Sequence, residues 1–169
     1  MNDDLIPIQI GPRCFPQTPD MGAIVQILSE NKKFVICIGH SEAIALEEAM
    51  QKQESPRPMT HQLMGSIMLG FDIRIRKAIV TQVMQGNFFG MLVLERKGSD
   101  GILQEAHIDC RASDAMVLSA RLEFPLETPP ETLLETHLET PPQAPLAPLP
   151  RAPEHLPSRP ARRRPHPTP

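Results

Sequence analysis

The densest group of reactive side chains lies in the segment IDCRASDAMVLSAR, residues 108–121. Its polar members are two carboxylates, a guanidinium and a hydroxyl, namely Asp109, Asp114, Arg111 and Ser113. Phosphodiester hydrolysis needs charge stabilisation on the non-bridging oxygens, an activated water and usually divalent ions held by carboxylates. The residue types therefore suit phosphodiester chemistry. They also suit a purely structural corner between a strand and a helix.

Carboxylates from two segments are candidates for a metal site. We expect Asp109, at a strand end, Asp114, in the first turn of a helix, and Glu42, at the start of another helix, to hold a divalent ion, Mg²⁺ or Mn²⁺. His61, in the segment SPRPMTH, is a candidate general acid or base. Together with Asp109 and Asp114 it makes up the predicted catalytic set.

Four further residues are candidates for binding a phosphate. The guanidinium groups of Arg57 and Arg111 can each donate two parallel hydrogen bonds to phosphate oxygens. Thr60 and Ser113 stand where two helices are expected to begin, and free backbone N–H groups at a helix N-terminus favour an anion. We therefore assign Arg57, Thr60, Arg111 and Ser113 to substrate binding.

Each of these residues also has a structural interpretation. Thr60 and Ser113 are ordinary helix N-caps, and Asp109 with Arg111 could form an ion pair that ties strand to helix. The charge balance also disfavours a strong binder of polyanions, because residues 1–126 hold 12 Lys and Arg against 15 Asp and Glu. A nuclease of this composition would rely on metal ions to offset the charge of its substrate.

Hydrophobic periodicity predicts the elements that must position these side chains. Alternating apolar residues and turn signals predict strands, and apolar residues three and four apart with capping residues predict helices. The predicted strands are residues 5–10, 22–28, 33–39, 71–85, 87–97 and 102–110, and the predicted helices begin at Ser41, Thr60 and Ser113. We expect the second helix to end at Gly70 and the last three strands to form an antiparallel meander joined by QGN and GSDG turns. This order predicts an α+β fold.

The C-terminal part has a different composition. Residues 125–169 hold 14 of the 20 prolines and repeat Leu-Glu-Thr, so we divide the chain into a folded domain, residues 1–126, and a disordered Pro-rich tail, residues 127–169. Residues 131–139 could form a short helix. The tail ends in RPARRRP, and this basic end could contact phosphates or a protein partner.

Cysteine usage and hydropathy indicate the compartment. The three cysteines show no metal-ligand spacing, and their odd number argues against a closed disulfide framework. No run of about 18 apolar residues, the length of a membrane-spanning helix, occurs in the sequence. The first residues are acidic, whereas a signal peptide begins with basic residues. We expect a cytoplasmic protein without a membrane partner.

Four segments resemble the bifunctional nuclease family in their sequence, order and spacing. The name of the family refers to DNase and RNase activity. The four segments are ICIGHSEAIAL (36–46), PRPMTHQLM (56–64), GNFFGMLVLE (86–95) and IDCRASDAMVLSA (108–120). The resemblance implies a small domain with a mixed, largely antiparallel, barrel-like sheet and about three helices, assembled as a homo-oligomer. Family members usually carry an acid where this chain has Gln62, and alanine and proline where it has Cys110 and Ala112.

Three hypotheses follow for function. The first is a nuclease that hydrolyses DNA or RNA with metal assistance, which requires the candidate residues to share one cleft. The second is a non-enzymatic oligomeric interaction module. The polar side chains of residues 109–114 would then all be used in internal hydrogen bonds or in a subunit interface, and the tail would recruit partners. The third is a protein that associates with nucleic acid through its basic tail. We expect the methionines Met59, Met64, Met68 and Met116 in the core or at a subunit interface.

Overall fold

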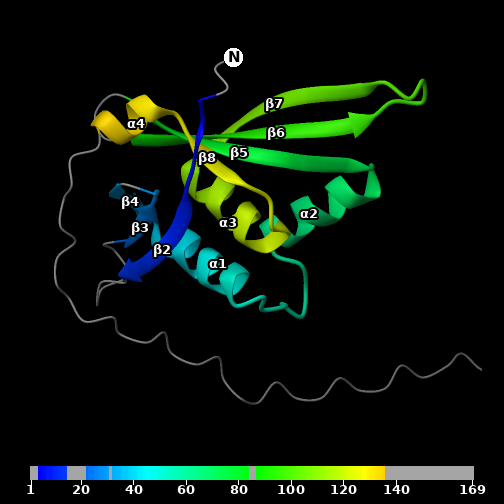
Figure 1. The fold of residues 1–169 in the computed structure, drawn as a ribbon. Helices are drawn as coiled ribbons and strands as arrows, with labels where there is room; N and C mark the ends of the chain where they lie inside the picture. The colour runs from blue at the N-terminus through cyan, green and yellow to red at the C-terminus, as the bar shows by residue number, and fades with distance from the viewer. Residues whose placement is uncertain (1–3, 15–21, 31, 84–86, 136–169) are drawn as a thin grey trace, which may run out of the picture.

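The computed structural model describes residues 4–14, 22–30, 32–83 and 87–135 (Figure 1). The strands are β1 (Ile6–Pro7), β2 (Gln9–Cys14), β3 (Ala23–Leu28), β4 (Lys33–Ile38), β5 (Ile73–Val83), β6 (Asn87–Lys97), β7 (Leu103–Arg111) and β8 (Leu126–Thr128). The helices are α1 (His40–Met50), α2 (Thr60–Gly70), α3 (Ala112–Leu122) and α4 (Pro130–Glu135). The α+β class predicted from the sequence is confirmed.

The described strands form two sheets. One has five strands in the order β1-β8-β5-β6-β7, and the other has three in the order β2-β3-β4. Every pair is antiparallel except β5 with β8, so the sheet arrangement is mixed and largely antiparallel, as expected. The predicted meander of β5, β6 and β7 is confirmed. A single barrel-like sheet is not observed, because the strands divide between the two sheets.

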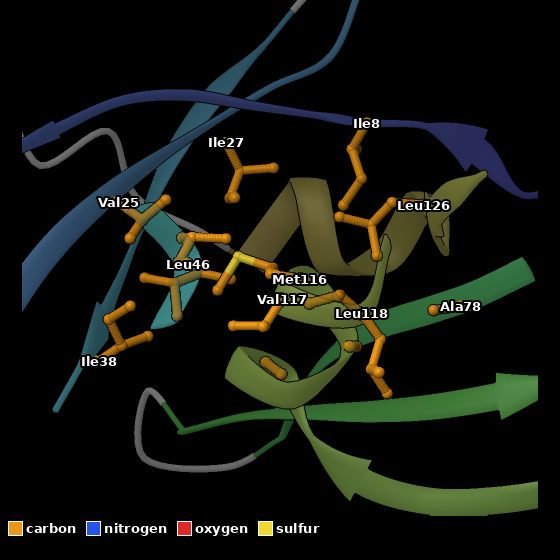
Figure 2. Packing of buried hydrophobic residues seen from close by; sticks show 14 of the residues in the cluster. Ile8, Val25, Ile27, Ile38, Leu46, Ala78, Met116, Val117, Leu118 and Leu126 are labelled. Atoms are coloured by element: carbon orange, nitrogen blue, oxygen red, sulfur yellow. The ribbon is translucent and has the colours of Figure 1, made fainter. Parts of the chain in front are cut away.

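The hydrophobic core lies between the two sheets, where α1 and α3 pack together (Figure 1). Helix α3 buries Met116 and Leu118 completely, and α1 contributes Leu46. Figure 2 shows these side chains in one apolar cluster with Ile27 from β3 and Leu126 from β8. The apolar residues of α3 therefore explain its central position, since the helix packs on α1 and on the five-stranded sheet.

The helix boundaries differ from the predicted ones by one residue or so. The N-cap positions are held by Gly39, Met59 and Arg111, one or two residues before Ser41, Thr60 and Ser113. None of these N-caps makes a side-chain capping bond. The predicted caps are wrong, because Ser41, Thr60 and Ser113 are already first or second residues inside their helices.

Helix α2 illustrates the difference at both of its ends. The side chain of Gln62 accepts a hydrogen bond of 2.8 Å from the backbone N–H of Met59, so Gln62 stabilises the helix start. At the other end, Gly70 is helical, and the left-handed conformation falls on Asp72 with φ 54°. Gly70 therefore does not end the helix in the way the sequence suggested.

The described fold continues past residue 126, where the sequence placed the start of the tail. Strand β8 lies between β1 and β5 and is anchored by the Thr128 hydroxyl, which donates a hydrogen bond of 2.6 Å to the Val80 carbonyl. Helix α4 then buries Thr132 and Leu133. Helix α4, Pro130–Glu135, confirms the first part of the short helix expected over residues 131–139. The rest of the tail, including its basic end, and the QGN turn lie outside the described residues.

No helix in the described part of the chain is long and apolar enough to cross a membrane.

Candidate functional site

Four of the predicted site residues meet in one polar cluster, which we call the Arg111 cluster. Its members are Glu42 from α1, His61 from α2, Arg111 at the end of β7 and Asp114 in the first turn of α3. Arg111 Nη1 donates to Glu42 Oε1 at 2.6 Å, and Arg111 Nε donates to Asp114 Oδ2 at 3.0 Å. A further bond of 3.1 Å joins Arg111 Nη2 to Asp114 Oδ1, and His61 Nε2 lies 3.0 Å from the same oxygen.

The cluster depends on a close approach between β6, β7 and α3. A Cβ atom added at Gly90 would lie 2.8 Å from the Arg111 carbonyl oxygen and 3.0 Å from Ala115 Cβ. Glycine at this position of β6 therefore lets the end of β7 turn directly into α3. The packing of α1 against α3 then brings Glu42 to the same corner.

The electrostatics of the cluster favour its ionised form. Burial alone would raise the pKa of the Asp114 carboxyl, but hydrogen bonds from Arg111 and His61 outweigh burial, and the net pKa is lowered. The pKa of Glu42 is lowered by a hydrogen bond from its own backbone N–H and then by Arg111. Both carboxylates raise the pKa of Arg111 further. At neutral pH the cluster therefore holds one guanidinium between two carboxylates.

The His61–Asp114 pair has the geometry of an oriented acid–base group. An ionised carboxylate only accepts hydrogen bonds, so the imidazole donates from Nε2 to Asp114 Oδ1. The other ring nitrogen, Nδ1, is then the atom that can accept or release a proton. The His61 side chain is 14% exposed, which leaves a small part of the ring open to solvent or a ligand.

Arg111 retains hydrogen-bonding capacity beyond the cluster. A guanidinium has five N–H donors, and three of them are used in the bonds to Glu42 and Asp114. The side chain is 64% exposed. Its outward edge can therefore donate to an oxygen of a bound phosphate while the two carboxylates hold the group in place.

The predicted metal site is not assembled in this arrangement. The guanidinium of Arg111 lies between Glu42 and Asp114, and Asp109 is an exposed residue of β7 that pairs with Met91 of β6. Among the described residues, no group of three or more His, Cys, Asp or Glu side chains is placed to hold a metal ion. These carboxylates do not fit a divalent ion as they stand, so Mg²⁺ or Mn²⁺ binding remains a prediction.

The remaining predicted residues stand apart from the cluster. In the part of the chain that the structure describes, the side chains of Asp109 and Arg57 make no hydrogen bond or ion pair with cluster members. Thr60 is exposed as the first residue of α2. Ser113 is 7% exposed, so a ligand has little access to its hydroxyl. The structure thus supports Arg111 for phosphate binding more directly than the other three.

Cys110 adjoins the cluster and was not assigned a role from the sequence. Burial, followed by the charges of Asp114 and Asp109, raises the pKa of its thiol to about 11. The thiol therefore stays protonated at neutral pH and is not activated as a nucleophile.

The fold and the cluster define a small α+β domain whose candidate site places a histidine–aspartate pair beside an exposed guanidinium. The family model described as the bifunctional nuclease domain matches residues 24–141, and the chain belongs to that family. The match includes all four residues of the Arg111 cluster.

Two curated relatives come from Mycobacterium tuberculosis. They are the uncharacterized protein MT1877 of strain CDC 1551 / Oshkosh and the uncharacterized protein Rv1829 of strain ATCC 25618 / H37Rv. Each is 26% identical to this chain over 91 residues, which is 54% of this chain and 51% of the relative. The match therefore spans about half the length of these relatives.

Proposed function

We propose that this protein cleaves phosphodiester bonds of RNA or DNA at the Arg111 cluster. The observation that carries the proposal is the 3.0 Å contact between His61 Nε2 and Asp114 Oδ1 beside the exposed edge of Arg111. A proton-transfer group and a phosphate-binding group are thus presented together. Membership of the bifunctional nuclease domain family supports the same chemistry.

In the proposed reaction an oxygen nucleophile, water or a ribose hydroxyl, attacks phosphorus and gives its proton to His61 Nδ1. The bond from phosphorus to the leaving sugar oxygen breaks, that oxygen takes up a proton from a water molecule, and His61 returns its proton to the resulting hydroxide. Asp114 keeps the imidazole oriented and stabilises its cationic form, as carboxylates do for catalytic histidines. Arg111 donates to the non-bridging oxygens, and Glu42 restrains its guanidinium.

A divalent ion, Mg²⁺ or Mn²⁺, remains part of the proposal as an accessory. When bound, such an ion would offset the charge of the phosphate. None of the steps above is assigned to it, because Glu42 and Asp114 are already bonded to Arg111.

A second candidate function is a non-enzymatic interaction module. It is favoured by one observation, which is that every member of the cluster bonds to another member. The cluster would then be a structural connection between α1, α2, α3 and β7. In this case substitutions in the cluster would lower stability without affecting any cleavage.

The two candidates are separated by locating the site of oligonucleotide binding. The full chain would be titrated with short single-stranded RNA and DNA oligonucleotides that carry a non-cleavable phosphate analogue, while NMR signals of the histidine rings and arginine side chains are recorded. We expect shifts at His61 and Arg111. As internal controls, His107 and Arg76, which both pair with Glu105, should remain unchanged.

The result that would contradict the proposal is equally specific. Shifts confined to His107 and Arg76, or a titration of the folded chain that moves none of these signals, would exclude the Arg111 cluster as the phosphate-binding site.

A further inference from the structure

Phe89 is the exposed member of an aromatic pair in β6. Consecutive side chains of a strand point to opposite faces, so Phe88 and Phe89 lie in different environments. Phe88 stacks on Phe34 of β4, with ring centroids 5.5 Å apart, and packs against the core. Phe89 is 43% exposed and stacks on no aromatic ring in the described part of the chain. Its ring is therefore open to a ligand.

The strand register places Phe89 beside the Arg111 cluster. Phe89 lies directly opposite Arg111 in the pairing of β6 with β7, and neighbouring strands are about 4.8 Å apart. Side chains alternate along β6, and Gly90 and Leu92 face α3 and the core. Phe89 and Met91 therefore lie on the other face of this sheet, which we call the outer face.

Asp109 lies on the same outer face, two residues before Arg111. It pairs with Met91, and directly opposite residues of two strands point to the same side of a sheet. Asp109 is the diagonal neighbour of Phe89, a separation of about 7–8 Å at which both side chains can contact one ligand. The carboxylate is exposed, and it makes no hydrogen bond or ion pair with another described residue. Both of its oxygens are therefore able to accept hydrogen bonds.

The outer face is hollowed next to these two residues. A cavity of about 450 Å³ lies between the sheet, the N-terminal segment and the start of α4, and its lining includes Thr81 and Met91. Thr81 of β5 lies opposite Phe89, and Met91 lies opposite Asp109. The volume is within the range of small-molecule sites. A flat group stacked on Phe89 therefore has space beside it.

We propose that Phe89 and Asp109 form a guanine subsite for a single-stranded substrate, an inference that rests on the proposed cleavage at the Arg111 cluster. The guanine base stacks on the Phe89 ring, and the adjoining phosphate contacts Arg111. Guanine has two neighbouring donors, N1–H and the 2-amino group, at the edge used for base pairing. These two donors match the two carboxylate oxygens of Asp109.

The other bases lack this pair of donors. At the same edge adenine, cytosine and uracil each place an N–H donor next to an acceptor atom, and a carboxylate repels an acceptor. Asp109 therefore favours guanine over the other three bases. Phe89 does not discriminate, because every base has a face that can stack on an aromatic ring.

Both contacts require an unpaired base. In a duplex, base pairing occupies the edge that Asp109 contacts, and stacking covers the face that Phe89 contacts. The subsite therefore gives the Arg111 cluster a preference for single strands over duplexes.

The first test measures binding of the full chain to oligouridine strands that carry a central G, A, C or U and a non-cleavable phosphate analogue. Fluorescence anisotropy gives the dissociation constants. The wild-type chain is expected to bind the G strand about tenfold more tightly than the other three, as a bidentate contact to a base commonly achieves. Annealing each strand to its complement should abolish this preference.

Two substitutions separate the contributions of the subsite. Asp109→Asn should remove the preference for G and leave the other strands bound as before, because asparagine has a single acceptor oxygen. Phe89→Leu should weaken binding of all four strands by about tenfold, because leucine cannot stack on a base. Asp72→Asn and Phe71→Leu are the matched controls, since both residues are exposed after the end of α2. Circular dichroism verifies that each variant is folded.

The outcomes distinguish the subsite from the proposed activity. Equal binding of the four strands by the wild-type chain would overturn the subsite and leave the proposed cleavage standing. The same conclusion holds if Asp109→Asn retains the preference for G, or if Phe89→Leu binds every strand as the wild type does. A folded wild-type chain that binds none of the strands would overturn both proposals.

Discussion

Replacing His61 with glutamine is expected to lower kcat/KM for phosphodiester cleavage by about 10²- to 10⁴-fold, the range that a positioned general acid or base contributes. Glutamine retains a hydrogen-bonding group that can reach Asp114, but it cannot carry a proton between the nucleophile and solvent. The loss should therefore fall mainly on kcat, measured with labelled single-stranded RNA and DNA.

His40→Gln is the matched control for this substitution. His40 begins α1, and its side chain makes no hydrogen bond or ion pair within the part of the chain that the structure describes. The control is expected to keep wild-type activity. Equal rates for His61→Gln and the wild-type chain would show that His61 transfers no proton in the reaction.

Replacing Arg111 with methionine is expected to lower cleavage by about 10²- to 10³-fold, as the loss of one preorganised donor to a charged transition state commonly does. Methionine keeps an unbranched side chain but removes all donors, which leaves Glu42 and Asp114 facing the substrate without a cation between them. The two carboxylates would then repel a phosphate. Arg96→Met is the matched control, since Arg96 is exposed on β6 away from the cluster.

The same variant should change how stability depends on pH. The pKa values of Asp114 and Glu42 are lower in the folded chain, so the cluster stabilises the fold above the ordinary carboxyl pKa of about 4 and loses this contribution as the pH falls through the lower folded values. The difference in unfolding free energy between wild type and Arg111→Met should therefore be largest near neutral pH and shrink on acidification. Urea denaturation at several pH values measures it, and a difference that grows in acid would contradict this account.

Local patterns were sufficient to predict most of the fold. The meander of β5, β6 and β7 has strong strand periodicity and recognisable turns, and α3 follows it with a clear apolar face. Strand β8 was missed because its three residues open a Pro-rich segment. Its position depends on parallel pairing of Leu126 with Ala78, a contact between residues far apart in the sequence. Such pairing leaves no local pattern.

Four of the predicted site residues lie together in the fold, and the roles assigned to them stay predictions. Residue types identified Glu42, His61, Arg111 and Asp114, which the fold brings together. The sequence did not indicate that Arg111 would bond to both carboxylates, because the carboxylates of Glu42 and Asp114 could equally bind a metal ion. Only the packing of α1 on α3 decides which partner each charge takes.

The most direct test of the central claim compares the wild-type chain with Asp114→Asn on single-stranded RNA and DNA, each with Mg²⁺, Mn²⁺ or EDTA. Asp100→Asn, in the turn between β6 and β7, serves as the matched control. We expect cleavage by the wild type and the control but not by Asp114→Asn, and the EDTA arm decides whether an ion is needed. Cleavage by all three, or by none of the folded proteins, would contradict the assignment of the Arg111 cluster as a nuclease site.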